Sequence, residues 1–486
     1  MRKKLAVLLA LIGLGVLAVS FIHAQTTGTP GDDNIGDAFY PTLGNSGYDA
    51  LHYNIDIDVN LNLNYLDGIV TIQAQATQDL SAFNLDFFGF QVDKILLDGD
   101  PVEYSRRARE LTITPNEPIA EGAEFEVIIT YAGVPEANEV NLFSGGWSRY
   151  RRGVYVASEP AGAALWYPVN DHPLDKATYS IQVTVPEPFV VASNGTLLEV
   201  EEAEDTRTYH WDNPEPTASY LVTVNIAQFE ERTDETSSGL PIRNYFPADI
   251  ADEGEVVFSQ QAAMIEYFET VFGPYPFDVY GAVVADVALP FALETQTISL
   301  FGRDTITQNT GRRSPDGAQG VIAHELAHQW FGNSVSLSTW EDIWLNEGFA
   351  TYAQALWIEH TQDAYARDAM IEQWYEIMAS GVVPSRLAMP GKPPRMNLFN
   401  TAVYLRGGLT LHALRLTVGD EAFFELLQTY TSRYADGNAT TQDFIDLAEA
   451  ISGQQLDDLF EGWLYEVEIP DIAEMDLFRE DFSLED

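Results

Sequence analysis

Two histidines and a glutamate within five residues form the strongest chemical pattern of the sequence, because residues 324–328 read His-Glu-Leu-Ala-His. On an α-helix, positions i and i+4 share one face about one turn apart, so His324 and His328 can bind a single metal ion. Glu325 lies beside them and can accept a proton from a metal-activated water. A motif this short also occurs in helices whose histidines are only core residues, so a third ligand must decide between the two interpretations.

The third ligand is predicted at Glu347, nineteen residues after His328, within Trp-Leu-Asn-Glu-Gly-Phe-Ala at 344–350. A second helix can present this carboxylate to the two imidazoles. Two histidines, one glutamate and an open position suit catalytic zinc, which acidifies bound water. We therefore expect one Zn²⁺ per chain, although another divalent metal is compatible with the same ligands. The chain has no cysteine, which excludes thiolate ligands and disulfides.

The residues around these ligands resemble the aminopeptidase N family of gluzincin zinc metallopeptidases. The resemblance is specific in two blocks, Val-Ile-Ala-His-Glu-Leu-Ala-His-Gln-Trp-Phe-Gly-Asn at 321–333 and the segment at 344–350. It extends to the family's N-terminal β domain through Gly-Asn-Ser-Gly-Tyr-Asp at 44–49 and, more loosely, Tyr-Pro-Val-Asn-Asp-His-Pro at 167–173. In all, the resemblance covers about residues 44–472.

The resemblance implies a site for the free N-terminus of a peptide. The family's Gly-Ala-Met-Glu-Asn motif is matched by Phe-Ala-Leu-Glu-Thr at 291–295, where only Ala292 and Glu294 agree. Glu294 is expected to bind the substrate's ammonium group through its carboxylate. Glu159 is expected to be the second anchor of that group. Tyr404, in a segment similar to the family's Tyr-x-Lys-Gly pattern, is expected to stabilise the oxyanion of the transition state.

Alternating apolar and polar residues between about positions 44 and 235 predict β-strands with one buried face, as in Tyr-Asn-Ile-Asp-Ile-Asp-Val-Asn at 53–60. After about position 236 the apolar residues recur every three to four positions, which predicts helices. The expected helices are 318–331, 347–360, 368–378, 402–416, 421–434 and 441–451, and a strand is expected near 280–287. We therefore predict a multidomain α+β fold. An N-terminal all-β saddle or sandwich domain (44–235) precedes a mainly helical metallopeptidase domain (236–475), which the resemblance makes thermolysin-like.

The N-terminal sequence is typical of an export signal. Met-Arg-Lys-Lys precedes an apolar run from Leu5 to Ile22, and the small residue Ala24 follows it. We expect residues 1–24 to be a signal peptide cleaved after Ala24 or, alternatively, a retained membrane anchor. Residues 25–43 are expected to form a polar linker and residues 476–486 an acidic tail. These features predict an extracellular protein, either secreted or tethered at the outer face of the cell membrane.

The charge balance argues against two classes of partner. The chain carries 74 acidic and 25 basic residues, for a net charge of −49. Nucleic acids and anionic membrane surfaces need clustered lysine and arginine, so neither is expected to bind the protein, apart from an N-terminal anchor in the lipid. The carboxylates either keep the protein soluble or steer cationic peptides towards the cleft, and the sequence does not separate these interpretations.

The predicted function is hydrolysis of N-terminal residues from peptides by a zinc aminopeptidase, with Glu325 as the base. A zinc endopeptidase is the first alternative. The chain ends at Asp486, where many members of the family continue into a long helical domain, so we expect a short form with an open cleft. Activity on N-terminally blocked peptides would separate the two. A non-catalytic peptide-binding protein on the same fold is the second alternative, and the intact set of ligands argues against it.

Overall fold

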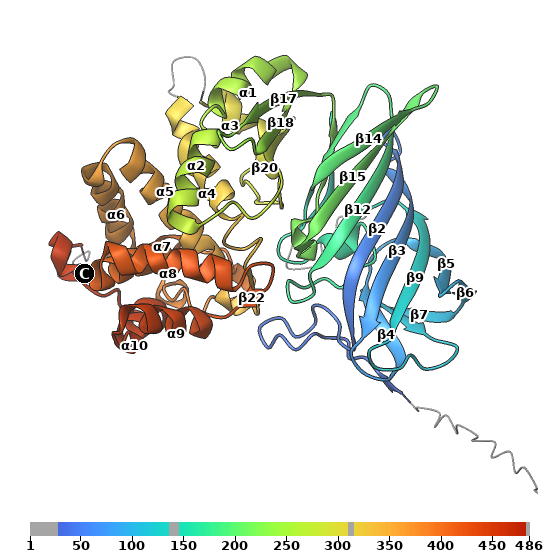
Figure 1. Cartoon of the computed structure of the whole chain (residues 1–486), viewed down its shortest axis with the longest axis horizontal. Helices are drawn as coiled ribbons and strands as arrows, with labels where there is room; N and C mark the ends of the chain where they lie inside the picture. The colour runs from blue at the N-terminus through green and yellow to red at the C-terminus, as the bar shows by residue number, and fades with distance from the viewer. Residues whose placement is uncertain (1–27, 136–144, 310–314, 483–486) are drawn as a thin grey trace, which may run out of the picture.

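The computed structural model describes residues 28–135, 145–309 and 315–482, which form a β half and a mainly helical half side by side (Figure 1). This arrangement confirms the predicted α+β fold. The expected signal peptide or anchor at 1–24 and the last four residues of the expected acidic tail lie outside the described residues. Each helix of the described part is too short or too polar to cross a membrane.

The β half is built on an eight-stranded sheet whose strands alternate between a buried and an exposed face. Along β2 (Tyr48–Asn60), Tyr53, Ile55 and Ile57 are at most 1% exposed, while the residues between them face outwards. This is the period of two that an extended chain imposes. The strand order is β14-β15-β12-β2-β3-β9-β5-β6. The other seven strands are β3 (Tyr65–Ala76), β5 (Gln91–Leu97), β6 (Asp100–Pro101), β9 (Glu124–Gly133), β12 (Ala177–Pro186), β14 (Thr196–Glu202) and β15 (Thr206–Thr217).

Two smaller sheets complete the β half, and one of them leads to the predicted site residue Glu159. The first has the order β1-β4-β8-β7, and the second β10-β11-β16-β13. Glu159 follows the end of β11 by two residues, so this strand is the β-half element that positions it. The bounds are β1 (Thr29–Pro30), β4 (Leu80–Asp86), β7 (Glu103–Arg107), β8 (Glu110–Thr114), β10 (Gly146–Tyr150), β11 (Gly153–Ala157), β13 (Val190–Ser193) and β16 (Val224–Ala227).

A four-stranded sheet joins the two halves because its faces belong to different cores. Its order is β17-β18-β19-β20, formed by β17 (Phe229–Glu235), β18 (Pro241–Pro247), β19 (Tyr280–Ala285) and β20 (Ser299–Gly302). In β19, Ala282 and Val284 pack into the helical core, while Val283 and Ala285 pack into the core of the β half. A strand buried on both faces has no polar alternation, which explains its continuous apolar sequence. β17 begins a few residues before position 236, where the boundary was expected.

The helical half follows the predicted helices closely, with one difference that matters for the site. The structure ends α4 at Ala327, whereas a helix to Phe331 was expected. His328 takes the cap position, and the chain then turns through Gly332, whose φ is +118°. A left-handed backbone at Gly332 is incompatible with a continuing helix. The helices are α1 (Ala251–Val257), α2 (Gln261–Phe272), α3 (Arg303–Thr307), α4 (Gln319–Ala327), α5 (Trp344–Thr361), α6 (Ala364–Ala379), α7 (Thr401–Val418), α8 (Asp420–Arg433), α9 (Thr441–Ser452), α10 (Asp457–Phe460) and α11 (Arg479–Phe482), with a short pair of strands, β21 (Ser336–Leu337) and β22 (Asn438–Ala439).

The segment predicted to be a polar linker packs against the helical half instead. Phe39, Tyr40 and Leu43 are buried in the helical core, although they lie before the β half in sequence. Asp37 accepts hydrogen bonds from Thr339 Oγ1 (2.7 Å) and from the backbone N–H of Trp340 (3.2 Å). The correction comes from long-range packing, which the polar composition of residues 25–43 does not reveal. We refer to residues 37–43 as the strap.

Asp37 also binds the β half, so one carboxylate bridges three segments. Its Oδ2 lies 3.1 Å from Nε2 of His172, and that nitrogen donates because Nδ1 accepts from the backbone N–H of Leu174 (3.1 Å). Although burial works to raise it, hydrogen bonds from His172, Thr339 and two backbone N–H groups lower the pKa of Asp37 to about 2. The carboxylate therefore stabilises the folded state only while it is ionised.

Replacing Asp37 with alanine should reduce the free energy of unfolding by about 3 kcal/mol near neutral pH, because buried donors lose their acceptor. The folded-state pKa lies below the unfolded value, so the contribution is complete above the unfolded pKa of 3.8 and is lost as the pH falls through about 2. Urea denaturation at pH 7 and at pH 3 measures both effects. Asp33→Ala, an exposed carboxylate nearby, is the control and should change stability by less than about 0.5 kcal/mol. An unchanged stability of Asp37→Ala at pH 7 would contradict the role of the strap.

Candidate metal centre and active cleft

Two helices bring the three predicted metal ligands together. Nε2 of His324 lies 3.1 Å from Oε2 of Glu347, and Nε2 of His328 lies 3.5 Å from the same oxygen. One ligand atom from each of the three side chains lies within 4.8 Å of the others, and all three side chains are buried. Two imidazole nitrogens and one carboxylate oxygen are a donor set that suits zinc. The residues present therefore fit the metal that the motif predicts.

Hydrogen bonds to the far side of each imidazole hold the rings in place. Nδ1 of His328 lies 3.0 Å from the carbonyl oxygen of Phe331, which can only accept, so Nδ1 carries a proton and Nε2 is the nitrogen that faces the other ligands. Nδ1 of His324 lies 2.9 Å from the side-chain amide of Gln354, whose nitrogen and oxygen serve either tautomer. Contacts of this kind orient metal-binding histidines and increase their affinity for the ion.

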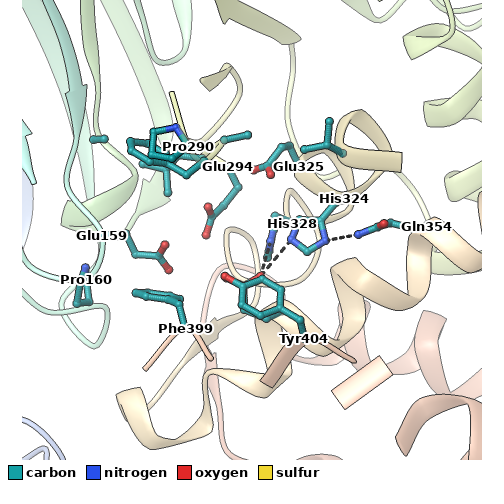
Figure 2. A pocket seen from close by; sticks show the side chains of 16 residues that line it. Glu159, Pro160, Pro290, Glu294, His324, Glu325, His328, Gln354, Phe399 and Tyr404 are labelled. Carbon is teal, nitrogen blue, oxygen red and sulfur yellow. Dashed lines mark hydrogen bonds and ion pairs between the residues drawn. The ribbon is translucent and has the colours of Figure 1, made fainter. Parts of the chain in front are cut away.

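The cavity beside these ligands brings together all eight residues predicted for the site. Its volume is about 600 Å³, and Figure 2 shows Glu159 and Glu294 pointing into it from one side and His324 and Tyr404 from the other. The lining residues from the prediction are Glu159, Ala292, Glu294, His324, Glu325, His328, Glu347 and Tyr404. Segments from β11, the loop before β20, α4, α5 and α7 meet here. The cavity therefore lies between the two halves of the molecule.

Four carboxylates converge on this cavity, and two of them have oxygens without a protein partner. Oε1 of Glu159 and Oε1 of Glu294 are buried and make no hydrogen bond within the described residues. Burial and the charges of the neighbouring glutamates raise the pKa of Glu159 well above its usual range. Burial also raises the pKa of Glu294. Two carboxylates in this condition are stabilised as anions when a cation binds between them.

Glu325 and Glu347 differ in their surroundings although both are buried. Burial, together with the charges of Glu294 and Glu347, raises the pKa of Glu325 well above its usual range. Although burial works to raise it, the charge of His328 and hydrogen bonds with both imidazoles lower the pKa of Glu347 to about 2. A carboxylate with a raised pKa suits a base that must accept a proton, and one with a lowered pKa suits a ligand that stays ionised.

A close contact between α5 and α7 brings Glu347 and Tyr404 to the same cavity. A Cβ atom on Gly348 would lie 2.9 Å from the backbone carbonyl carbon of Gly407, so only glycine lets the helices approach this closely. The Tyr404 ring stacks beside His324, with ring centroids 6.0 Å apart. Burial and the surrounding glutamates raise the pKa of Tyr404 well above 10, so its hydroxyl keeps its proton and can donate.

Gln354 and Phe399 are among the lining residues that were not predicted from the sequence. Gln354 follows Glu347 by seven residues, which is about two turns along α5, so both side chains lie on the same face of this helix. Phe399 lines the cavity beside Glu159 and precedes α7 by two residues, without a periodic signal of its own (Figure 2). The helical period could therefore have indicated Gln354, whereas the sequence did not distinguish Phe399 from an ordinary core residue.

Comparison with known proteins relates both halves of the chain to one family. Residues 257–463 match the model of the peptidase family M1 domain, and residues 49–221 match that of the peptidase M1 N-terminal domain. The chain is 27% identical over 317 residues to "Aminopeptidase M1" of Arabidopsis thaliana, and 25% identical over 429 residues to human "Endoplasmic reticulum aminopeptidase 1". These matches cover 63% and 82% of this chain but only 36% and 45% of the two relatives. The chain thus spans less than half the length of either.

A solved structure matches over nearly its whole length. The M1 zinc metallopeptidase of Deinococcus radiodurans is 31% identical, with a TM-score of 0.80 over 90% of this chain and 98% of that chain. A mutant of the same enzyme, solved with a Tyr-Ser-Ala substrate, matches with 30% identity and a TM-score of 0.81 over the same shares. The similarity includes both the β half and the helical half.

Gln354→Ala should weaken zinc binding about 10- to 100-fold, because His324 loses the contact that orients its ring. Competition with a chromophoric chelator at fixed pH measures the affinity. Gln362→Ala, an exposed glutamine just after the end of the same helix, is the matched control and should bind zinc as the unmodified protein does. Equal affinity in both variants would show that Gln354 does not support the metal site.

Proposed function

The chain belongs to peptidase family M1, and from that membership we propose that it is a zinc-dependent aminopeptidase that removes N-terminal residues from peptides. The observation that carries this proposal is the pair of unpartnered carboxylate oxygens, on Glu159 and Glu294, beside the cluster of His324, His328 and Glu347. A free peptide N-terminus carries the cation that this pair lacks. An internal stretch of peptide offers no such cation at its backbone, so the pair favours an exopeptidase over an endopeptidase.

The spacing of the two clusters explains why the first peptide bond would be cut. An oxygen of Glu294, an oxygen of Glu325 and a ring nitrogen of His328 all lie within 4.8 Å of one another. An ammonium group bound to Glu294 therefore places the adjacent carbonyl near Glu325 and the imidazoles. Fixing the reacting bond beside the base in this way lowers the entropy cost of the reaction.

Glu325 is the base in this proposal. It takes a proton from the water that attacks the carbonyl carbon, and it later gives a proton to the departing amine nitrogen. Zinc held by His324, His328 and Glu347, one ion per chain, would polarise the carbonyl as a Lewis acid and make the attacking water more acidic. Burial raises the pKa of Glu325, and a raised pKa helps this carboxylate to accept the proton of the water.

Tyr404 would stabilise the charge that develops on the carbonyl oxygen. Its hydroxyl lines the same cavity, stays protonated and faces the ligands from α7 (Figure 2). A donor aimed at charge that exists only in the transition state lowers the barrier without tightening substrate binding. The Deinococcus structure with its Tyr-Ser-Ala substrate supports short peptides as the substrate class.

Hydrolysis of aminoacyl-arylamides by the purified protein tests this function. Free-amine substrates should be cleaved, and their N-acetylated versions should not, because acetylation removes the cation. Glu325→Gln should lower kcat by about 10²–10⁴-fold and Tyr404→Phe by about 10²–10³-fold, with KM changing much less. The exposed Glu372→Gln is the matched control and should retain full activity.

Cleavage of the acetylated substrates at a similar rate would instead identify an endopeptidase. An inactive protein that binds zinc and unblocked peptides would be a binding protein. Either result would contradict the proposed function.

We also propose that the protein is exported. The basic start, the apolar run from Leu5 to Ile22 and the small residue at Ala24 support this proposal. Cell fractionation with N-terminal sequencing should place the protein outside the cytoplasm, beginning at Gln25 if the signal is cleaved and at the original N-terminus if it is retained. A protein found only in the cytoplasm with residues 1–24 intact would overturn the proposal.

A further inference from the structure

The position of Glu294 depends on its backbone, because one oxygen of its carboxylate has no partner within the described residues. Oε1 of Glu294 makes no hydrogen bond within the described residues, although the side chain is only 2% exposed. The residue lies in the loop between β19 and β20, and Leu293 bridges Leu300 at one end of the turn. Contacts that hold the backbone of residues 294–297 therefore also hold the carboxylate that faces the substrate amine.

Two buried amides hold the backbone carbonyl of Glu294. Asn333 Nδ2 donates to this oxygen at 2.7 Å, and Gln329 Nε2 donates to it at 3.3 Å. Both side chains are 0% exposed. Oε1 of Gln329 also accepts the backbone N–H of Thr297 at 2.8 Å, so one glutamine closes both ends of the four-residue turn. Oδ1 of Asn333 has no partner in the described part of the chain, so this amide stabilises the turn through its bond to the carbonyl of Glu294.

The turn needs such support because its backbone is strained. Thr297 has a φ of +66°, a left-handed conformation that is costly for a β-branched residue. The β half contributes further bonds to the same turn. Asn194 Nδ2 donates to the carbonyl of Gln296 at 2.7 Å, and the N–H of Gly195 donates to Thr297 Oγ1 at 2.8 Å. Strained conformations persist only where several contacts determine them together.

The two amides stand on the same turn that carries the metal ligand His328. Gln329 follows His328 directly, and the N–H of Asn333 donates to the carbonyl of His328 at 3.0 Å. Lys176 Nζ, from the β half, donates to the carbonyl of Asn333 at 2.8 Å. The metal ligand and the amine anchor are therefore connected through one rigid, buried network of hydrogen bonds.

We propose that Asn333 and Gln329 are positioning residues that set the distance between the amine anchor and the metal site. Asn333 acts through Glu294, and Gln329 acts through Glu294 and through a longer contact of 3.5 Å with the backbone carbonyl of Glu325. Neither amide side chain lines the cavity. Their loss lets the turn at 294–297 relax, so the ammonium group is bound less well while the metal ligands stay in place. The preference of the enzyme for a free N-terminus thus depends on two amides that follow the metal-binding motif. This inference rests on the proposed function.

Two hydroxamates that differ only in the amine test the inference. Leucine hydroxamate and 4-methylpentanohydroxamate share the chelating group and the side chain, and only the first carries the ammonium group. Inhibition constants, or calorimetry with the zinc-loaded protein, give the affinity for each compound. The ratio of the two affinities measures what the amine contributes to binding. In Asn333→Ala this ratio should fall about tenfold, with the affinity of the amine-free compound unchanged.

The matched control is Asn84→Ala. Asn84 is another buried asparagine, and its amide donates to the carbonyl of Gly31 in a part of the β half that does not line the cavity. This variant should leave the ratio as it is in the unmodified protein. Gln329→Met removes the second amide at nearly constant volume and should lower the ratio in the same direction, which keeps the test open if Asn333→Ala does not fold. An unchanged ratio in the folded variants, or an equal loss of affinity for both compounds, overturns the inference. If the unmodified protein itself shows no preference for leucine hydroxamate, the proposed function fails, and the inference fails with it.

Discussion

Four carboxylates that meet in one cleft repel each other, and the rest of the structure depends on how this repulsion is relieved. Glu159, Glu294, Glu325 and Glu347 line the same cavity, and burial prevents water from screening their charges. Two imidazoles lie within hydrogen-bonding distance of Glu347 alone. The arrangement is stable as a set of anions only when cations bind, which the metal ion and the substrate's ammonium group provide at adjacent positions.

Holding these charges together requires a rigid frame made of both halves. The helices α5 and α7 touch at Gly348 and Gly407, and the neighbouring Arg406 is fully buried. Its guanidinium donates to the carbonyls of Ala388 and Gly462 at 2.8 and 2.7 Å, which ties the segment before α7 to the helical turn at Glu461–Tyr465. The β half supplies Glu159 after β11. Packing and hydrogen bonds to backbone carbonyls thus hold the four carboxylates in place against their mutual repulsion.

The sequence predicted the parts of this arrangement that depend on local spacing. His324, Glu325 and His328 follow from one helical turn, and Glu347 follows from the need for a third ligand. Period-two alternation indicated the β character of the first half, and three-to-four spacing located the helices α4 to α9. Glu159, Glu294 and Tyr404 came from the family resemblance, because the cavity joins segments far apart in the chain, and no local pattern indicates that they meet. The family match supports that resemblance, and the structure places all three in the cavity.

Features that depend on long-range contacts were missed. The strap looked polar, yet Phe39 and Tyr40 enter the helical core, because a few apolar side chains outweigh the composition of the surrounding residues. The early end of α4 was hidden by an apolar run through Trp330 and Phe331, whose side chains are buried in a turn as well as they would be in a helix. Gln329 and Asn333 stood within the recognised motif, but the carbonyl they hold lies more than thirty residues away.

A crystal structure of the Glu325→Gln variant with a free-amine tripeptide, recorded with anomalous data at the zinc edge, tests the central claim most directly. The account predicts one anomalous peak about 2.0–2.2 Å from the ligand atoms of His324, His328 and Glu347. It also predicts the peptide's amine between Glu159 and Glu294, with the first carbonyl facing residue 325. A metal bound elsewhere, or a peptide whose N-terminus points away from the two carboxylates, would contradict it.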